Sequence, residues 1–133
     1  MKKAFVFCII CFSGVVLFTA CKKNSEVAEA GLVAQTTPAN NSNNLNILGP
    51  DFPLKVEITS TMPPQGVKID ITAKKEGSAD PAFYSNTNNS SAPQNNYTIT
   101  NTPSGVTCVV TVTVTSLTKS NNVWMGSYRY SKK

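Results

Sequence analysis

The sequence contains no histidine, one tryptophan and one arginine. Histidine is the commonest general base and the commonest metal ligand in proteins, so its absence excludes Ser-His-Asp triads and Cys-His nucleophile pairs. Charged residues are also scarce, at 14% of the chain, and asparagine, serine and threonine supply most of the polarity. These absences favour a non-enzymatic protein without a cofactor.

The positive net charge of +5 is a weak signal of function. Lys2 and Lys3 belong to a leader that we expect to be removed, which leaves 10 basic side chains against 7 acidic ones from Cys21 onward. Arg129 is the only arginine, and no basic helix is indicated. Nucleic-acid sites are usually rich in clustered arginine and lysine, so we expect no nucleic-acid partner.

The N-terminus has the pattern of a secretory signal peptide. Two lysines follow Met1, and residues 4–18 are then almost wholly apolar. This apolar run matches the hydrophobic region of a signal peptide and is shorter than the ~20 residues that a membrane span needs. We therefore predict a cleaved leader over residues 1–20, and an uncleaved single-span anchor is the alternative.

The end of this leader resembles the lipobox of bacterial lipoproteins. In Phe18-Thr19-Ala20-Cys21, a bulky apolar residue lies three places before a cysteine and small residues fill the positions between them. The resemblance implies cleavage before Cys21 and attachment of a diacylglycerol to its thiol, which anchors the protein in a membrane. In this family an aspartate after the cysteine commonly signals inner-membrane retention. Lys22 stands there instead, so the resemblance implies the outer membrane, facing the periplasm or the cell surface.

The remaining cysteines complete this interpretation. Cys8 and Cys11 lie in the leader and are lost with it, so Cys108 is the only free thiol of the mature chain. No internal disulfide is then available. Cys108 alternates with valines on one side of a predicted strand, and free cysteine is often buried, so we predict a packing role for it.

The composition of residues 21–50 is typical of a tether. The stretch is rich in asparagine and contains Pro38 and Pro50, with few large apolar residues. Such a composition buries too little apolar surface to offset the entropy of ordering. We predict a flexible chain that spans roughly 30 Å and holds a folded domain over residues 51–133 away from the membrane.

The domain begins with two segments of period-two alternation, which indicates strands with one apolar face. Residues 54–59 and 67–74 alternate in this way, and the turn sequence TMPPQG separates them. If they pair as a hairpin, Ile58 lies opposite Ile69, and a one-residue slip would break the apolar match. The alternation therefore predicts a hairpin in this register.

Further short strands follow, and no segment after residue 50 has a helical period. Five or six strands with one apolar and one polar face are typical of a small antiparallel sandwich. We predict an all-β, immunoglobulin-like β-sandwich of five to seven strands, with a half-open barrel as the alternative. The further strands are expected at 82–85, 97–100, 106–117 and 123–131, with a polar loop over 86–96.

Three aromatic residues of the last predicted strand are candidates for ligand binding. Trp124, Tyr128 and Tyr130 share one side of the strand, with Gly126 between them. An exposed row of aromatic rings can stack sugar rings, as carbohydrate-binding modules do. A small sandwich also needs aromatic residues in its core. The pattern favours the core for Trp124 and Tyr128 and leaves Tyr130 open.

Other polar patterns carry simpler interpretations. In the predicted hairpin Glu57 and Asp70 are cross-strand neighbours, the arrangement that glycoside hydrolases use across a cleft. Lysines surround them, which indicates an ordinary exposed face. Asp51 and Asp80 lack the spacing of calcium ligands, so no metal site is predicted. The alternating threonines of residues 111–115 form a ladder like those of ice-binding proteins, but β-branching alone favours threonine in strands.

Together these features predict a lipoprotein anchored through Cys21 that displays a small non-enzymatic β-sandwich. Its expected role is binding or adhesion, or service as an accessory subunit of an envelope complex, with a glycan or protein as partner. The alternative is a carbohydrate-binding module that acts beside a separate enzyme.

Overall fold

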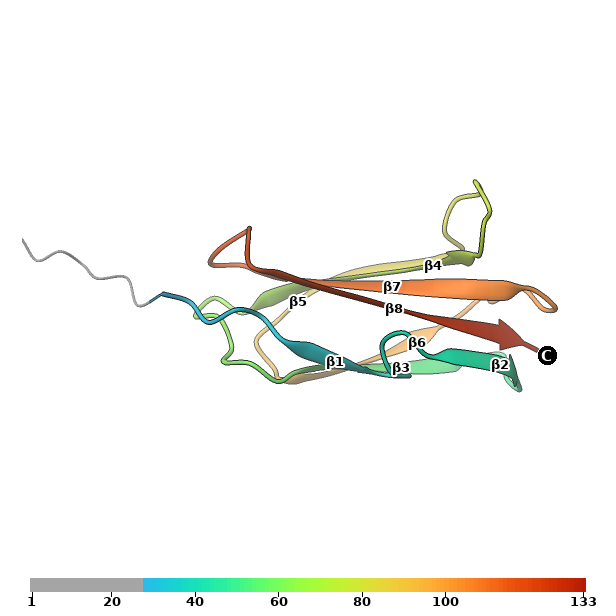
Figure 1. Cartoon of the computed structure of the whole chain (residues 1–133), viewed down its shortest axis with the longest axis horizontal. Helices are drawn as coiled ribbons and strands as arrows, with labels where there is room; N and C mark the ends of the chain where they lie inside the picture. The colour runs from blue at the N-terminus through green and yellow to red at the C-terminus, as the bar shows by residue number, and fades with distance from the viewer. Residues whose placement is uncertain (1–27) are drawn as a thin grey trace, which may run out of the picture.

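The computed structural model describes residues 28–133, so the predicted leader and Cys21 lie outside the described residues. All regular structure in this range is β-strand, and no helix in it is long and apolar enough to cross a membrane. The all-β prediction is confirmed, although the strands number eight rather than five to seven (Figure 1). The strands are β1 (Ala34–Thr37), β2 (Asn43–Ile47), β3 (Phe52–Ile58), β4 (Val67–Lys75), β5 (Tyr84–Ser90), β6 (Gln94–Ile99), β7 (Thr107–Ser116) and β8 (Val123–Lys132).

The strands form two sheets that pack face to face (Figure 1). One sheet has the order β1-β3-β6 and the other β2-β8-β7-β4-β5. All neighbours are antiparallel except β2 and β8, which are parallel. In immunoglobulin lettering β3 and β6 take the places of strands B and E, while β5, β4, β7 and β8 take those of C′, C, F and G. The predicted immunoglobulin-like sandwich is confirmed.

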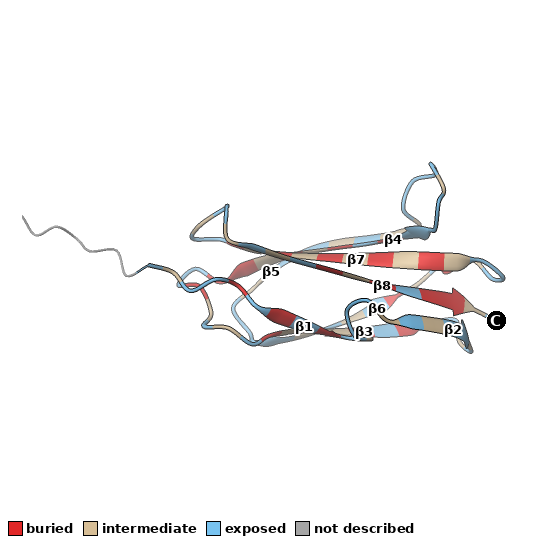
Figure 2. Ribbon diagram, in the orientation of Figure 1, coloured by how far each residue is buried: buried red, intermediate tan, exposed pale blue. Residues whose placement is uncertain are grey.

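Strict alternation places the apolar side chains between the two sheets. Val112 and Val114 of β7 are fully buried, while Thr111, Thr113 and Thr115, which alternate with them, lie on the outer side. Figure 2 shows buried and half-buried residues alternating along β7. The larger members of this fully buried set are Tyr130, Leu54, Ile69, Ile71, Ile99, Val56, Val67, Val110, Val112 and Val114.

Cys108 belongs to this core, as predicted. Its side chain is 0% exposed, and it is a free thiol. Burial raises the pKa of the Cys108 thiol, and the charge of Lys75 opposes this rise only in part. A reactive cysteine needs an exposed thiolate, so Cys108 packs and does not react.

The prediction of a flexible tether over residues 21–50 is wrong for residues 34–47, which contain β1 and β2, while residues 21–27 lie outside the described residues. Ala34 of β1 pairs with Ile58, and Asn43 of β2 pairs with Arg129. An edge strand needs only one buried face, and Leu32, Ala34 and Thr36 supply it by alternation. Of the asparagines that suggested disorder, Asn40, Asn41, Asn43 and Asn46 are exposed and Asn44 is half-buried. The folded domain therefore includes residues well before Asp51.

The predicted hairpin between residues 54–59 and 67–74 is also wrong. Ile58 lies opposite Ala34 in one sheet, whereas Ile69 lies between Asn88 and Val114 in the other. The connection from β3 to β4 crosses between the sheets. An apolar strand face is buried equally well by a neighbouring strand in a hairpin and by a second sheet packed against it. Alternation therefore identifies the buried face but not the partner strand.

The predicted loop over residues 86–96 contains most of β5 and the start of β6. Asparagine is unfavourable in strands, but pairing with neighbours overrides this weak preference. β5 keeps an unbroken register with β4 from Tyr84 to Ser90. β6 then crosses to the other sheet and pairs with β3. Both are edge strands, where polar side chains are tolerated on the exposed side.

The turn before β4 depends on Gly66. Gly66 has a φ of +83°, and a Cβ there would lie 2.5 Å from the Ser90 carbonyl oxygen. Gly77 also has a positive φ, +68°, but a Cβ there would meet nothing within 4 Å. Gly77→Ala should cost about 1 kcal/mol, the strain of a left-handed alanine. Gly66→Ala should cost ~2–4 kcal/mol, because the backbone at Ser90 must also move. Urea unfolding of both variants measures the difference, and equal losses would contradict the close approach.

Candidate binding surface on the five-stranded sheet

The predicted aromatic row does not form an exposed surface. Tyr128 and Tyr130 are only 3% and 1% exposed, so both lie in the core. The Tyr130 ring packs on Phe52 with 4.8 Å between ring centroids, and it lies 6.1 Å from the ring of Tyr128. The Tyr130 hydroxyl shares a hydrogen bond of 2.6 Å with the hydroxyl of Thr102. These two tyrosines hold the two sheets together and present no ring to a ligand.

Trp124 is half-buried at the start of β8 and packs against the edge of the core. A Cβ on Gly126 would lie 2.4 Å from Cη2 of the Trp124 indole, so the ring covers the bare backbone of this glycine. The side-chain oxygen of Asn40 lies 3.1 Å from the same position. Trp124 therefore covers part of the core and has no neighbouring exposed ring from Tyr128 or Tyr130.

The buried tyrosine hydroxyls are unsuited to acid-base chemistry near neutral pH. Burial raises the pKa of Tyr130 to about 12, although the hydrogen bond with Thr102 acts in the opposite direction. Burial also raises the pKa of Tyr128 strongly, and the neighbouring Tyr130 and Tyr84 raise it further. Both groups remain neutral, as core residues should.

Part of the outer side of the five-stranded sheet is a different kind of surface, which we call the threonine face. Lys74, Val109 and Arg129 continue the same side of the sheet beyond it. Side chains on this side come from four adjacent strands, and the register places them in rows such as Met125, Thr113, Asp70 and Thr87. Most are small, uncharged and able to form hydrogen bonds. The threonine face comprises Lys68, Asp70, Thr72, Ser85, Thr87, Asn89, Thr111, Thr113, Thr115, Val123, Met125 and Ser127.

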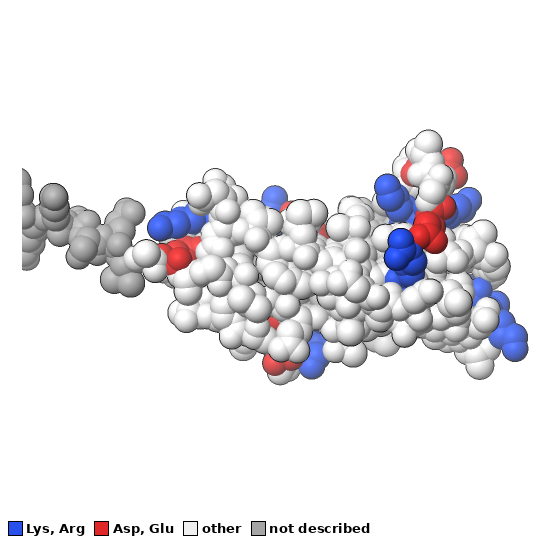
Figure 3. Space-filling model, in the orientation of Figure 1, with Lys and Arg blue, Asp and Glu red and all other residues white. Residues whose placement is uncertain are grey.

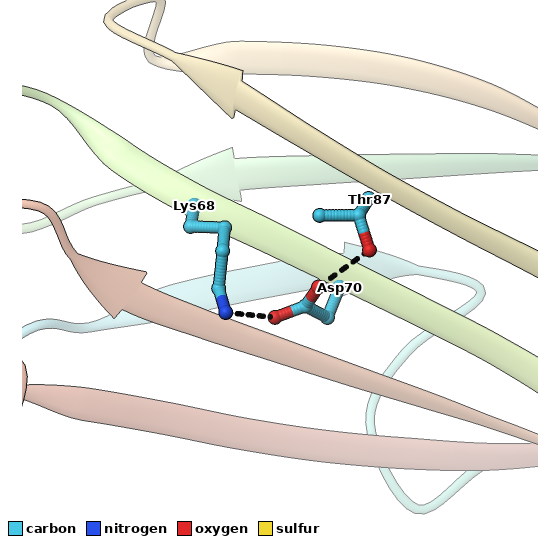
Figure 4. A network of polar contacts seen from close by, with 3 residues as sticks. All are labelled: Lys68, Asp70 and Thr87. Atoms are coloured by element: carbon cyan, nitrogen blue, oxygen red, sulfur yellow. Dashed lines mark hydrogen bonds and ion pairs between the residues drawn. The ribbon is translucent and has the colours of Figure 1, made fainter.

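One charged network lies within this face (Figure 4). The Thr87 hydroxyl donates a hydrogen bond of 2.7 Å to Oδ1 of Asp70, and the Lys68 ammonium lies 3.1 Å from Oδ2. The hydrogen bond from Thr87 and the interaction with Lys68 lower the pKa of Asp70, while its partial burial opposes this. Asp70 is therefore an ionised, fixed acceptor at neutral pH.

Glu57 does not lie beside Asp70, contrary to the predicted hairpin. Glu57 is in β3 and Asp70 is in β4, which belong to different sheets. Each pairs with a lysine of its own strand, Glu57 with Lys55 at 3.3 Å and Asp70 with Lys68. The paired carboxylates that glycoside hydrolysis requires are thus not assembled.

A shallow hollow borders the threonine face beside β8. It has a volume of about 240 Å³ and is lined by Asn40, Asn41, Thr111, Met125, Gly126 and Ser127. The segment that crosses from β1 to β2 forms its wall, because the Asn41 amide donates to the Ser127 carbonyl at 2.7 Å. The Ser127 amide donates to the side-chain oxygen of Asn40 at 2.8 Å. The hollow was not predicted from the sequence. The Asn40-Asn41 turn was the one local sequence feature that pointed to it.

Hydroxyl and amide groups, one ion pair and the 64%-exposed Met125 give the threonine face the chemistry of recognition rather than of reaction. Residues 28–133 contain no group of three or more histidine, cysteine or acidic side chains that could hold a metal ion. Asp80 forms an ion pair with Lys75, with 3.7 Å between the ammonium nitrogen and the carboxylate oxygen.

A scan of protein-family models found no match to the chain, and searches of curated proteins and of solved structures likewise found none.

The Asp70 network predicts a pH dependence of stability. Because the folded-state pKa of Asp70 is lowered, its contribution is present above the unfolded pKa and is lost as the pH falls through the folded pKa. Thr87→Val should raise the pKa of Asp70 and reduce stability at pH 7 by under about 1 kcal/mol, the usual size for a partly exposed network.

Carboxyl NMR titration and urea unfolding at pH 7 and pH 2 measure both effects. Thr72→Val is the matched control, since Thr72 shares the threonine face but does not bond to Asp70. The stability difference between the Thr87 variant and the parent should shrink at pH 2. An Asp70 pKa that shifts equally in both variants would contradict the assignment.

Proposed function

We propose that the protein is a lipid-anchored, non-enzymatic binding domain of a bacterial outer membrane, which recognises a protein partner through its threonine face. The anchor is proposed from the leader and from Phe18-Thr19-Ala20-Cys21. The recognition surface is proposed from one observation: a broad sheet face of hydroxyl and amide groups, with exposed Met125 and Val123 at one side.

The composition of this face favours a protein over a glycan. Sugar rings stack on exposed aromatic rings, and the threonine face contains none. Of the three aromatic residues on which the carbohydrate-binding alternative depended, Tyr128 and Tyr130 are buried and Trp124 is half-buried against the core. Methionine is adaptable and is common at protein-binding surfaces, and fixed hydroxyl groups supply directional hydrogen bonds around it.

Removal of the lipid acceptor tests the anchor. Cys21→Ala should shift the protein from the membrane pellet to the soluble fraction, because no acyl chain can then be attached. Cys108→Ala is the matched control, since Cys108 lies in the core and is remote from the lipobox sequence. Fractionation and blotting of both variants measure the result. A Cys21 variant that still pellets with membranes, while the control behaves identically, would overturn lipid anchoring.

Site-specific photo-cross-linking tests the recognition surface. A photoreactive residue at Met125 should cross-link a protein in intact cells. The same residue at Thr98 should not, since Thr98 is exposed on the other sheet in β6. The cross-linked partner is detected as a discrete band and identified by mass spectrometry. Equal products at both positions, or none at Met125 in cells that carry the acylated protein, would contradict binding by the threonine face.

A further inference from the structure

One end of the sandwich lies next to the proposed anchor. This proximal tip consists of residues 28–33, the β3–β4 connection 59–66 and the β7–β8 connection 117–122. The Leu32 amide donates to the side-chain oxygen of Asn122 at 2.8 Å, and the Asn122 side chain donates to the Ala30 carbonyl at 2.9 Å. The C-terminus lies at the opposite end (Figure 1). The start of the described chain is thus fixed to the tip.

The distance from the anchor to this tip is limited by chain length. Seven residue steps separate Cys21 from Ala28. Even a fully extended chain of this length spans at most about 25 Å. The ten residues of β7 alone extend ~33 Å, so the connection is shorter than the domain it carries. The proximal tip is therefore the part of the domain that an acylated Cys21 holds closest to the lipid surface.

The surface of the tip has the chemistry of a lipid contact. A groove of about 640 Å³ opens there, and its walls are mainly apolar. Exposed Val33 and Leu117 lie on the same tip, 53% and 38% accessible. The groove is lined by Ala28, Glu29, Ala30, Thr61, Met62, Pro64, Thr118 and Lys119.

The tip carries two charged side chains, the cationic Lys119 and the acidic Glu29. Lys119 lies at the groove and forms no ion pair within residues 28–133. Glu29 is the acidic side chain of the tip, and its Oε1 accepts a hydrogen bond of 2.6 Å from Asn122. Lys22 and Lys23 add two positive charges in the sequence between the anchor and the tip. Cationic side chains with apolar stems are typical of protein surfaces that rest at a membrane interface.

The opposite end of the sandwich has a different composition. Two ion pairs lie there, Arg129 with Glu76 and Lys75 with Asp80, and Lys74, Lys132 and Lys133 add further charge to this end. Figure 3 shows basic and acidic side chains together around the β4–β5 connection, at the end far from the start of the described chain. Paired charges prefer water, so this end is suited to face away from the lipid.

We infer that the proximal tip rests on the phospholipid surface, with acyl chains or glycerol groups against the Met62 groove and lipid phosphate beside Lys119. This inference rests on the proposed acylation of Cys21. The long axis of the sandwich then points away from the bilayer. The contact between the tip and the lipid restricts the rotation of the domain about its anchor. The occupant of the groove is the bilayer that holds the anchor, because the chain brings no other surface as close.

Depth-dependent quenching tests this orientation on the full acylated protein. We would purify it with its native anchor and reconstitute it into vesicles of phosphatidylcholine and phosphatidylglycerol that contain brominated lipid. Cys108→Ala provides the background. Single probe sites are Thr61→Cys at the proximal tip and Ala79→Cys in the β4–β5 connection, both exposed, each labelled with an environment-sensitive fluorophore.

The label at Thr61 should be quenched several-fold more than the label at Ala79, with a blue-shifted emission. Lys119→Glu should reduce the quenching at Thr61, while Lys74→Glu, at the opposite end, should leave it unchanged. Equal quenching at Thr61 and Ala79 in protein that mass spectrometry shows to be acylated would overturn the docked tip and leave the anchor intact. If mass spectrometry shows that the full protein purified from membranes carries no acyl chain on Cys21, the proposed anchor itself is overturned.

Discussion

The contact between the two sheets is the constraint on which the rest of the structure depends. Immunoglobulin domains of antibodies join strands B and F with a disulfide across this contact. Here Cys108 lies in β7, the strand F equivalent, and it is free and buried. Apolar packing must therefore hold the sheets, and each fully buried valine, isoleucine or leucine contributes ~1.5–3 kcal/mol. Tyr130 adds a buried hydrogen bond to Thr102 between β8 and the segment before β7.

The proposed recognition surface follows from the same alternation. The spacing that buries Val112 and Val114 also turns Thr113 and Thr115 outward, so the core and the threonine face are two sides of one pattern. Register then brings Thr87 to Asp70 from the neighbouring strand, and Lys68 comes from two positions away on the same strand. A rigid sheet thus fixes polar groups that would be mobile on a loop, which reduces the entropy lost on binding.

Period-two patterns allowed the fold class, the long strands and the buried Cys108 to be predicted from the sequence. The partners of β3 could not be predicted, because Ile58 meets an apolar surface equally well in a hairpin and across two sheets. The strands β1 and β2 were missed, and β5 was predicted only at its start, by the short strand at 82–85. The asparagines of β2 and β5 have low strand propensity, and only tertiary pairing holds these strands. The threonines of β7 were recognised, but the hollow beside Met125 depends on how residues 38–42 cross between sheets.

The parallel pairing of β2 with β8 has a mechanical consequence. The described chain starts at one end of the sandwich and the C-terminus lies at the other (Figure 1). A force that pulls these two ends apart shifts β2 and β8 in opposite directions along their common axis. The bonds that resist it include Arg129 amide to Ser42 carbonyl, at 2.9 Å, and Lys133 amide to Ile47 carbonyl, at 3.1 Å. These bonds lie across the pulling direction and bear the force together, so the domain resists shear along its long axis better than it would resist peeling one bond at a time.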